Sequence, residues 1–151
     1  MNSTNKNVYL VTAMEQDKIS RILLYWLNEY PDLPASINYE FLSSGEPSMA
    51  LSTIQGATKT KRYITGGYEA QYQFKVIYRA QPGDSNDGRL RADETLNDLG
   101  DWACTNPDLP DLGVGISCLR IETNARSSLF GRYENGDEDH QILMTMTYEV
   151  I

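Results

Sequence analysis

Residues 67–80 alternate between two kinds of side chain over an unusually long stretch. Seven positions on one face, the even-numbered ones from Tyr68 to Ala80, are apolar or aromatic, whereas five of the six side chains between them are polar. This period of two predicts a strand with one buried face and one face in contact with water. Fourteen strand residues would span about 46 Å, longer than the roughly 38 Å diameter of a compact domain of this length, so the strand must bend, bulge or project.

A pair of glycines, Gly66 and Gly67, stands at the start of this strand. Adjacent glycines between strand-forming residues are typical of a tight hairpin turn. We therefore predict that residues 60–65 pair back as the other arm of a long β-hairpin. A projecting, aromatic-rich hairpin is prone to aggregation in a monomer, so we expect another surface to cover it.

Two segments have the spacing of amphipathic helices. The first, about 13–29, carries an apolar stripe with a period near 3.6 residues, and Thr12 with Glu15 resembles a capping box at its start. The second, about 86–103, is predicted to turn an apolar face inward and its acids outward. The inward residues we expect are Leu90, Leu96, Leu99 and Ala103.

The remaining apolar segments predict shorter strands. We expect strands at 37–42, 51–57 (weaker), 116–123 and 140–150, with a loop at 43–48, a turn at 124–128 and an Asn-Gly turn at Asn135. One mixed or antiparallel sheet with a long β-hairpin, flanked by two helices, follows from this order, which is typical of an α+β fold. Residues 1–151 form one domain in this interpretation, with 1–10 as a flexible N-terminal segment.

Composition excludes several classes of protein. The formal net charge of −8 disfavours a general nucleic-acid binder. The longest apolar run, residues 22–27, is far shorter than the roughly 20 residues needed to cross a bilayer. We expect no secretory signal in the polar first residues, and reduced thiols at Cys104 and Cys118.

Catalytic patterns are sparse in this chain. The only histidine, His140, follows three acids at 137–139, which permits a metal-dependent hydrolase using Asp137, Asp139 and His140. A solvated acidic turn entering a strand explains the same residues without any metal. The two cysteines lack the spacing of a zinc or redox site, and no phosphate-binding loop is present. We therefore expect no enzymatic activity and no cofactor.

Charge is distributed unevenly along the chain. Residues 58–79 carry a net charge of +4, and residues 84–111 a net charge of −6. If the basic hairpin and the acidic helix meet on neighbouring copies, the contact is head to tail, and such contacts generate rings or filaments. The alternative is that both clusters are ordinary solvated faces.

Residues 51–74 (LSTIQGATKTKRYITGGYEAQYQF) resemble the central hairpin of tail terminator proteins from long-tailed phages of Gram-positive bacteria, a family also described as minor capsid or head–tail joining proteins. The preceding helix with Leu24-Tyr25-Trp26-Leu27 and the following acidic helix, which ends near Trp102, are similar in order and spacing. The likeness covers about residues 13–150.

This resemblance implies a structural virion protein at the tail–head junction, assembled in the cytoplasm of the host bacterium. Its subunits would form a hexameric ring that caps the tail tube, ends tube polymerisation and meets the head connector or stopper protein. Genome DNA would pass through the lumen without specific binding, which an acidic lumen would favour. A head-completion or stopper protein at the same junction is the alternative, and no membrane is involved.

Two sets of candidate residues follow. For the subunit interface we expect Lys59, Lys61, Arg62, Tyr63, Tyr68 and Tyr72 on the hairpin, with Asp93, Glu94 and Asp98 on the acidic helix. For exposed docking or lumen loops we expect Ser44, Glu46, Asp137, Glu138 and Asp139. No catalytic or metal-binding residue is assigned.

Overall fold

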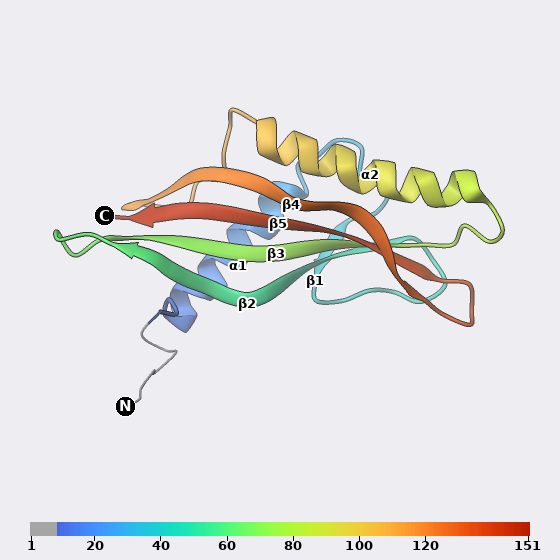
Figure 1. Ribbon diagram of the computed structural model, residues 1–151, viewed down its shortest axis with the longest axis horizontal. Coiled ribbons are helices and arrows are strands. Elements are labelled where there is room, and N and C mark those ends of the chain that lie inside the picture. The colour runs from blue at the N-terminus through green and yellow to red at the C-terminus, as the bar shows by residue number, and fades with distance from the viewer. Residues whose placement is uncertain (1–8) are drawn as a thin grey trace.

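The computed structural model describes residues 9–151 and contains two helices and one five-stranded sheet (Figure 1). The chain order is α1 (Ala13–Leu27), β1 (Ile37–Tyr39), β2 (Ser48–Arg62), β3 (Tyr68–Ala80), α2 (Asn86–Thr105), β4 (Ile116–Arg132) and β5 (Glu138–Val150). The strands are arranged β1-β2-β3-β5-β4, with β1 and β2 parallel and the other pairs antiparallel. The α+β fold with one mixed sheet and two flanking helices is confirmed.

Strand β3 is the centre of the sheet and keeps the predicted alternation. Its side chains at Ala70, Tyr72, Phe74 and Val76 are fully buried. Strand β5 pairs with β3 along its whole length, from Tyr68 opposite Val150 to Ala80 opposite Glu138. The hairpin is therefore covered on one side by another strand, and its length is accommodated by an elongated sheet that extends past the helices (Figure 1).

Strand β2 differs from the sequence prediction, which divided it into a strand at 51–57 and a separate arm at 60–65. It is continuous from Ser48 to Arg62, with register shifts against β3 between Thr53 and Ala57 and again before Lys61. Gln55 and Gly56 both adopt positive φ in the first shift. A bulge of this kind bends a strand without ending it, which is why a glycine there did not mark a boundary.

Two other strand predictions were wrong in length. Strand β4 runs through the expected turn at 124–128, because two of its four register shifts against β5 lie there and absorb the irregular residues. The strand expected at 37–42 ends at Tyr39, and Glu40 adopts a φ of 55° while its carboxylate accepts hydrogen bonds from the Thr53 amide and the Ser52 hydroxyl. These departures lie at the two edges of the sheet, where bulges and short strands are common.

Both helices cover the same face of the sheet. Helix α1 buries Ile19, Leu23 and Leu27 against the hairpin half, and α2 buries Leu96 and Leu99 against the other half. The rings of Trp26 and Trp102 lie 4.7 Å apart where the two helices meet. Leu90, expected to face inward, is 60 % exposed, because it lies off the buried stripe of α2, which begins at Ala92 and continues through Leu96.

The start of the described chain is bound to the sheet rather than free. The Lys59 amide donates to the Tyr9 carbonyl at 2.6 Å, and the Val11 amide donates to the Ala57 carbonyl at 3.2 Å. The expected flexible segment 1–10 is therefore corrected at Tyr9 and Leu10, and its residues 1–8 lie outside the described part of the chain.

Candidate interaction surfaces

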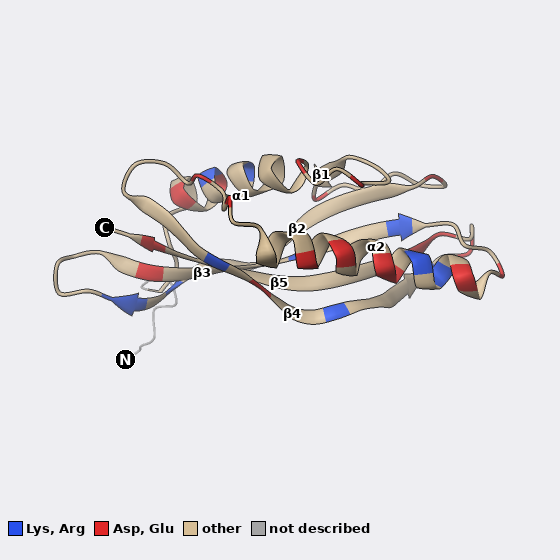
Figure 2. Ribbon diagram, turned by 90° about the horizontal axis from the view of Figure 1, so that it is seen from above, with Lys and Arg blue, Asp and Glu red and all other residues tan. Residues whose placement is uncertain are grey.

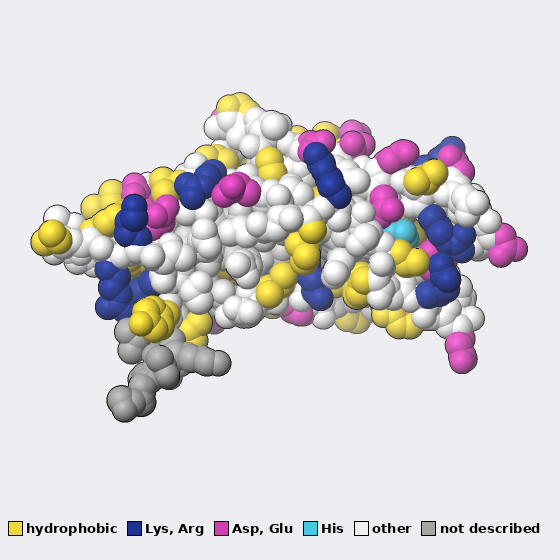
Figure 3. Space-filling model, in the orientation of Figure 1, with side chains coloured by type: hydrophobic (Ala, Val, Ile, Leu, Met, Phe, Trp, Pro, Cys, Tyr) yellow, Lys and Arg dark blue, Asp and Glu magenta, His cyan; other side chains and the backbone are white. Residues whose placement is uncertain are grey.

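The hairpin turn carries the predicted basic residues at one end of the molecule. The Tyr63 amide donates to the Gly67 carbonyl at 2.8 Å, and Gly66 adopts a φ of 98° that closes the turn. Lys61 and Arg62 are exposed there, whereas the Lys59 ammonium lies 4.6 Å from the centre of the Tyr68 ring. Figure 3 shows cationic side chains near this end and again at the opposite end.

The hairpin tyrosines make contacts within the chain. The Tyr63 hydroxyl donates to Glu149 Oε2 at 3.2 Å, and the Tyr68 hydroxyl donates to Glu15 of α1. Burial, followed by the bond to Glu15, raises the pKa of Tyr68 above its usual value. Both side chains are half-buried and so remain partly available to a neighbouring molecule.

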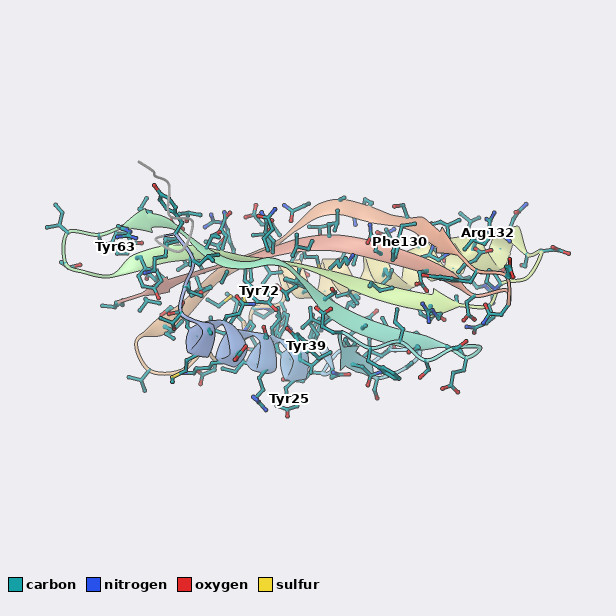
Figure 4. The ribbon with its side chains drawn as sticks, turned by 90° about the horizontal axis from the view of Figure 1, so that it is seen from below. Tyr25, Tyr39, Tyr63, Tyr72, Phe130 and Arg132 are labelled. Atoms are coloured by element: carbon teal, nitrogen blue, oxygen red, sulfur yellow. The ribbon has the colours of Figure 1, made fainter. Side chains whose placement is uncertain are left out.

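Tyr72 is not available to a second subunit, which corrects its assignment to the interface. Its side chain is fully buried, and its hydroxyl lies 2.8 Å from the Ser20 Oγ of α1. Figure 4 shows Tyr72 on the side of the sheet that faces α1, and Tyr25 on the far side of that helix. The alternation of β3 identified the buried face correctly, but it did not show that a helix already covers that face.

The predicted acids of α2 divide into two groups. Asp93 accepts hydrogen bonds from the Ser127 hydroxyl at 2.8 Å and pairs with His140 Nδ1 at 2.9 Å, so its carboxylate fixes α2 to β4 and β5. Glu94 and Asp98 are exposed, and neither forms an ion pair with any residue in 9–151. Figure 2 shows acidic positions spaced along α2.

Asp137, Glu138 and Asp139 are buried, which corrects their placement in exposed loops. Asp137 accepts hydrogen bonds from the Gly45 amide, Gln81 and Asn135, each at 3.0 Å. The surrounding loop and strand ends therefore close over this turn. Ser44 and Glu46 are exposed, as predicted.

Arginines neutralise the other two carboxylates of this turn. Arg79 contacts the two oxygens of Asp139 at 2.7 and 2.9 Å, and its guanidinium lies 4.9 Å from the centre of the Tyr133 ring. Arg89 of α2 donates to Glu138 at 2.8 Å, and Arg132 at 3.3 Å. The Arg89 hydrogen bond lowers the pKa of Glu138, and hydrogen bonds led by the Gly45 amide lower the pKa of Asp137. The cations at this end of the molecule therefore have partners in the chain.

The metal-site hypothesis is not supported by the positions of its residues. Asp137 binds the 43–48 loop, Asp139 binds Arg79, and His140 points to Asp93 on α2. Among residues 9–151 no group of three or more potential ligands is placed to hold a metal ion. Hydrogen bonds and arginines already occupy the carboxylates that the hypothesis required.

Sequence reasoning missed an aromatic group on the helical side. Tyr30 and Trp102 are half-buried, and their ring centres lie 5.5 Å apart at the junction of the two helices. The signal was present, because Trp26 and Tyr30 belong to the apolar stripe of the first helix. A partly exposed pair of aromatic rings is typical of contact surfaces between proteins.

A hollow of about 260 Å³ between α1 and β1 is lined by Leu24, Tyr25 and Tyr39 together with Asp17, Ser20 and Arg21. None of the described helices is long and apolar enough to span a bilayer.

No protein-family model matches the chain, and a search of curated proteins finds no match either.

Proposed function

We propose that this chain is a structural virion protein of a long-tailed phage. Its copies form a ring that caps the tail tube, ends tube polymerisation and joins the tail to the head connector. The observation that carries the proposal is the separation, within one chain, of an exposed basic hairpin end and the exposed acids of α2. The resemblance of residues 51–74 to tail terminators adds the biological setting.

The two charged regions lie too far apart to meet inside one molecule. In the backbone register of the sheet, Lys61 of β2 lies opposite Glu69 at the start of β3. Gly100 of α2 lies against Ile142 of β5, which is opposite Val76 of β3. Val76 lies seven positions after Glu69 along β3, a distance of about 23 Å at strand spacing. A lysine side chain cannot cross that distance, so the opposite charges can attract each other only between copies.

A contact between two different surfaces of the same chain is heterologous. Repeated copies then form a closed ring or an open filament, depending on the angle between neighbours. Complementary charges favour such docking and fix its orientation. A ring of this kind suits a tail terminator, and equally a stopper at the head–tail junction, which is the second candidate.

The test is to measure self-association and tube capping. We expect a mass well above the 17.1 kDa of one chain by light scattering, or ring assembly when tail tubes are supplied. A terminator shortens or stops tube growth in a polymerisation assay, whereas a stopper binds the connector and leaves tube length unchanged. A strict monomer that neither caps nor binds tubes would contradict the proposal.

A further inference from the structure

Three aromatic rings form a rigid group where α1 ends against α2. Trp26 and Trp102 have ring centres 4.7 Å apart, and Tyr30 and Trp102 have theirs 5.5 Å apart. The Trp26 indole Nε1 donates to the Asp108 carbonyl at 3.0 Å, which fixes the group against the loop after α2. Trp26 is buried beneath, so the accessible part of the group belongs to Tyr30 and Trp102.

Carboxylates surround the accessible rings. Burial raises the pKa of Tyr30, and the nearby negative charges of Asp32 and Asp98 raise it further. Asp98 lies one helical turn before Trp102 on α2, so the two side chains share a face of the helix. Both acids are exposed, and neither has an ion-pair partner in residues 9–151. We refer to Tyr30, Asp32, Asp98 and Trp102 as the aromatic-acidic surface.

We infer that the aromatic-acidic surface receives Lys61 from the hairpin of a second copy of this chain. An ammonium group is attracted to the faces of aromatic rings and to carboxylates, and the half-buried position of the rings reduces the competition from water. This inference rests on the proposed ring assembly and names the surface that accepts the hairpin. The inference assigns the contact to the junction of α1 and α2, and not to the negative charge along α2 in general.

Lys61 is the cation that best fits this role. It is exposed on a hairpin that extends past the helices, next to the fully exposed tip residue Ile64 (Figure 1). Lys59, by contrast, already lies over the Tyr68 ring. The cations at the opposite end of the molecule, Arg79 and Arg89, are ion-paired with buried carboxylates.

Charge reversal at each side of the contact tests the inference. We expect Lys61→Glu, and separately the double variant Asp32→Lys with Asp98→Lys, to weaken self-association about tenfold or more in sedimentation experiments. The matched control is Asp17→Lys with Glu134→Lys, which adds the same charge at exposed acids away from the helix junction and should leave association unchanged. Thermal melting checks that each variant is folded.

Mixing the two defective variants gives a sharper result. The Lys61→Glu chain keeps an intact aromatic-acidic surface, and the doubly substituted chain keeps an intact hairpin. One contact of each mixed pair is native, and the other joins the two reversed charges, which again have opposite sign. The mixture should therefore recover association that each variant alone has lost. Quenching of tryptophan fluorescence should accompany this association, since Trp102 lies in the contact.

The outcomes separate the two proposals. If the native chain assembles and caps tubes while the Asp32 and Asp98 double variant assembles equally well, the inference about the accepting surface is overturned and the ring function stands. If the control variant loses association to the same degree, the effect is one of overall charge and the inference is again overturned. A native chain that neither associates nor caps tubes overturns both.

Discussion

The phenol of Tyr72 joins the central strand to α1 from inside the core. Its hydroxyl is satisfied by Ser20, while the hydroxyls of Tyr68 and Tyr148 both bond to Glu15. The polar residues Glu15 and Ser20 therefore lie on the sheet side of α1, because three tyrosine hydroxyls beneath the helix need partners. The sequence predicted a capping box formed by Thr12 and Glu15. The Glu15 amide donates to the Thr12 Oγ at 3.2 Å, as in such a box, whereas the Glu15 carboxylate accepts from the two tyrosines instead.

Substitution of Tyr72 distinguishes a core position from an interface position. We expect Tyr72→Asp to unfold the domain, because it removes a buried ring and leaves a carboxylate in an apolar site, at a cost above about 4 kcal/mol. Tyr72→Phe should lose only the hydrogen bond to Ser20, about 1 kcal/mol in the free energy of unfolding. Chemical denaturation of both variants measures this. A folded but monomeric Tyr72→Asp protein would show that the burial assignment is wrong.

At the scale of elements, the hairpin turn is held by a close approach of two backbones. A Cβ on Gly67 would collide with the Val150 carbonyl oxygen and crowd the Ile151 Cα. Backbone atoms cannot move aside as the end of a flexible side chain can. The glycine pair read from the sequence as a turn signal therefore has a second role in packing the hairpin against β5.

Gly67→Ala should consequently destabilise the fold. We expect the free energy of unfolding to fall by about 1–3 kcal/mol, the usual cost of forcing extra atoms into a packed site. The control is Thr65→Ala in the same turn, an exposed position where the change should cost less than about 0.5 kcal/mol. Urea denaturation of the two variants gives the comparison, and equal stabilities would contradict the proposed backbone contact.

At the scale of the whole molecule, the two ends of the elongated sheet are built differently. The hairpin end leaves Lys61 exposed, whereas the opposite end gathers Asp137, Glu138 and Asp139 with arginines from β3, α2 and β4. Segments far apart in sequence are joined there by polar contacts rather than by an apolar core. The stability of that end should therefore depend on pH.

The sign of this dependence follows from the lowered pKa values of Asp137 and Glu138. Their stabilisation is fully present above the usual carboxyl pKa of about 4.5 and is lost as the pH falls through the lower pKa of the folded state. We expect Glu138→Gln to be less stable than the native chain at pH 7 and to lose less stability on acidification. Thermal melts from pH 7 to pH 3 test this, with the exposed Glu134→Gln as control. Parallel curves for native and Glu138→Gln proteins would refute the role of Glu138.

The sequence by itself determined the elements with a clear period. The alternation of β3, the apolar stripe of α1 and the glycine turn at Gly66 predicted a hairpin beside two helices, because local periodicity directly reflects which side of an element is buried. The lengths of β2 and β4 did not follow, since bulges depend on the partner strand across the sheet and leave no regular pattern in the chain.

Tertiary structure alone decided which charged residues are available at the surface. Asp137 and Glu94 have the same chemical character in the sequence, but Asp137 is enclosed by donors from three separate segments while Glu94 stays in solvent. Similarly, only the packing of α1 against α2 brings Tyr30 next to Trp102. Burial of a charge depends on partners supplied from distant parts of the chain, and no local pattern contains that information.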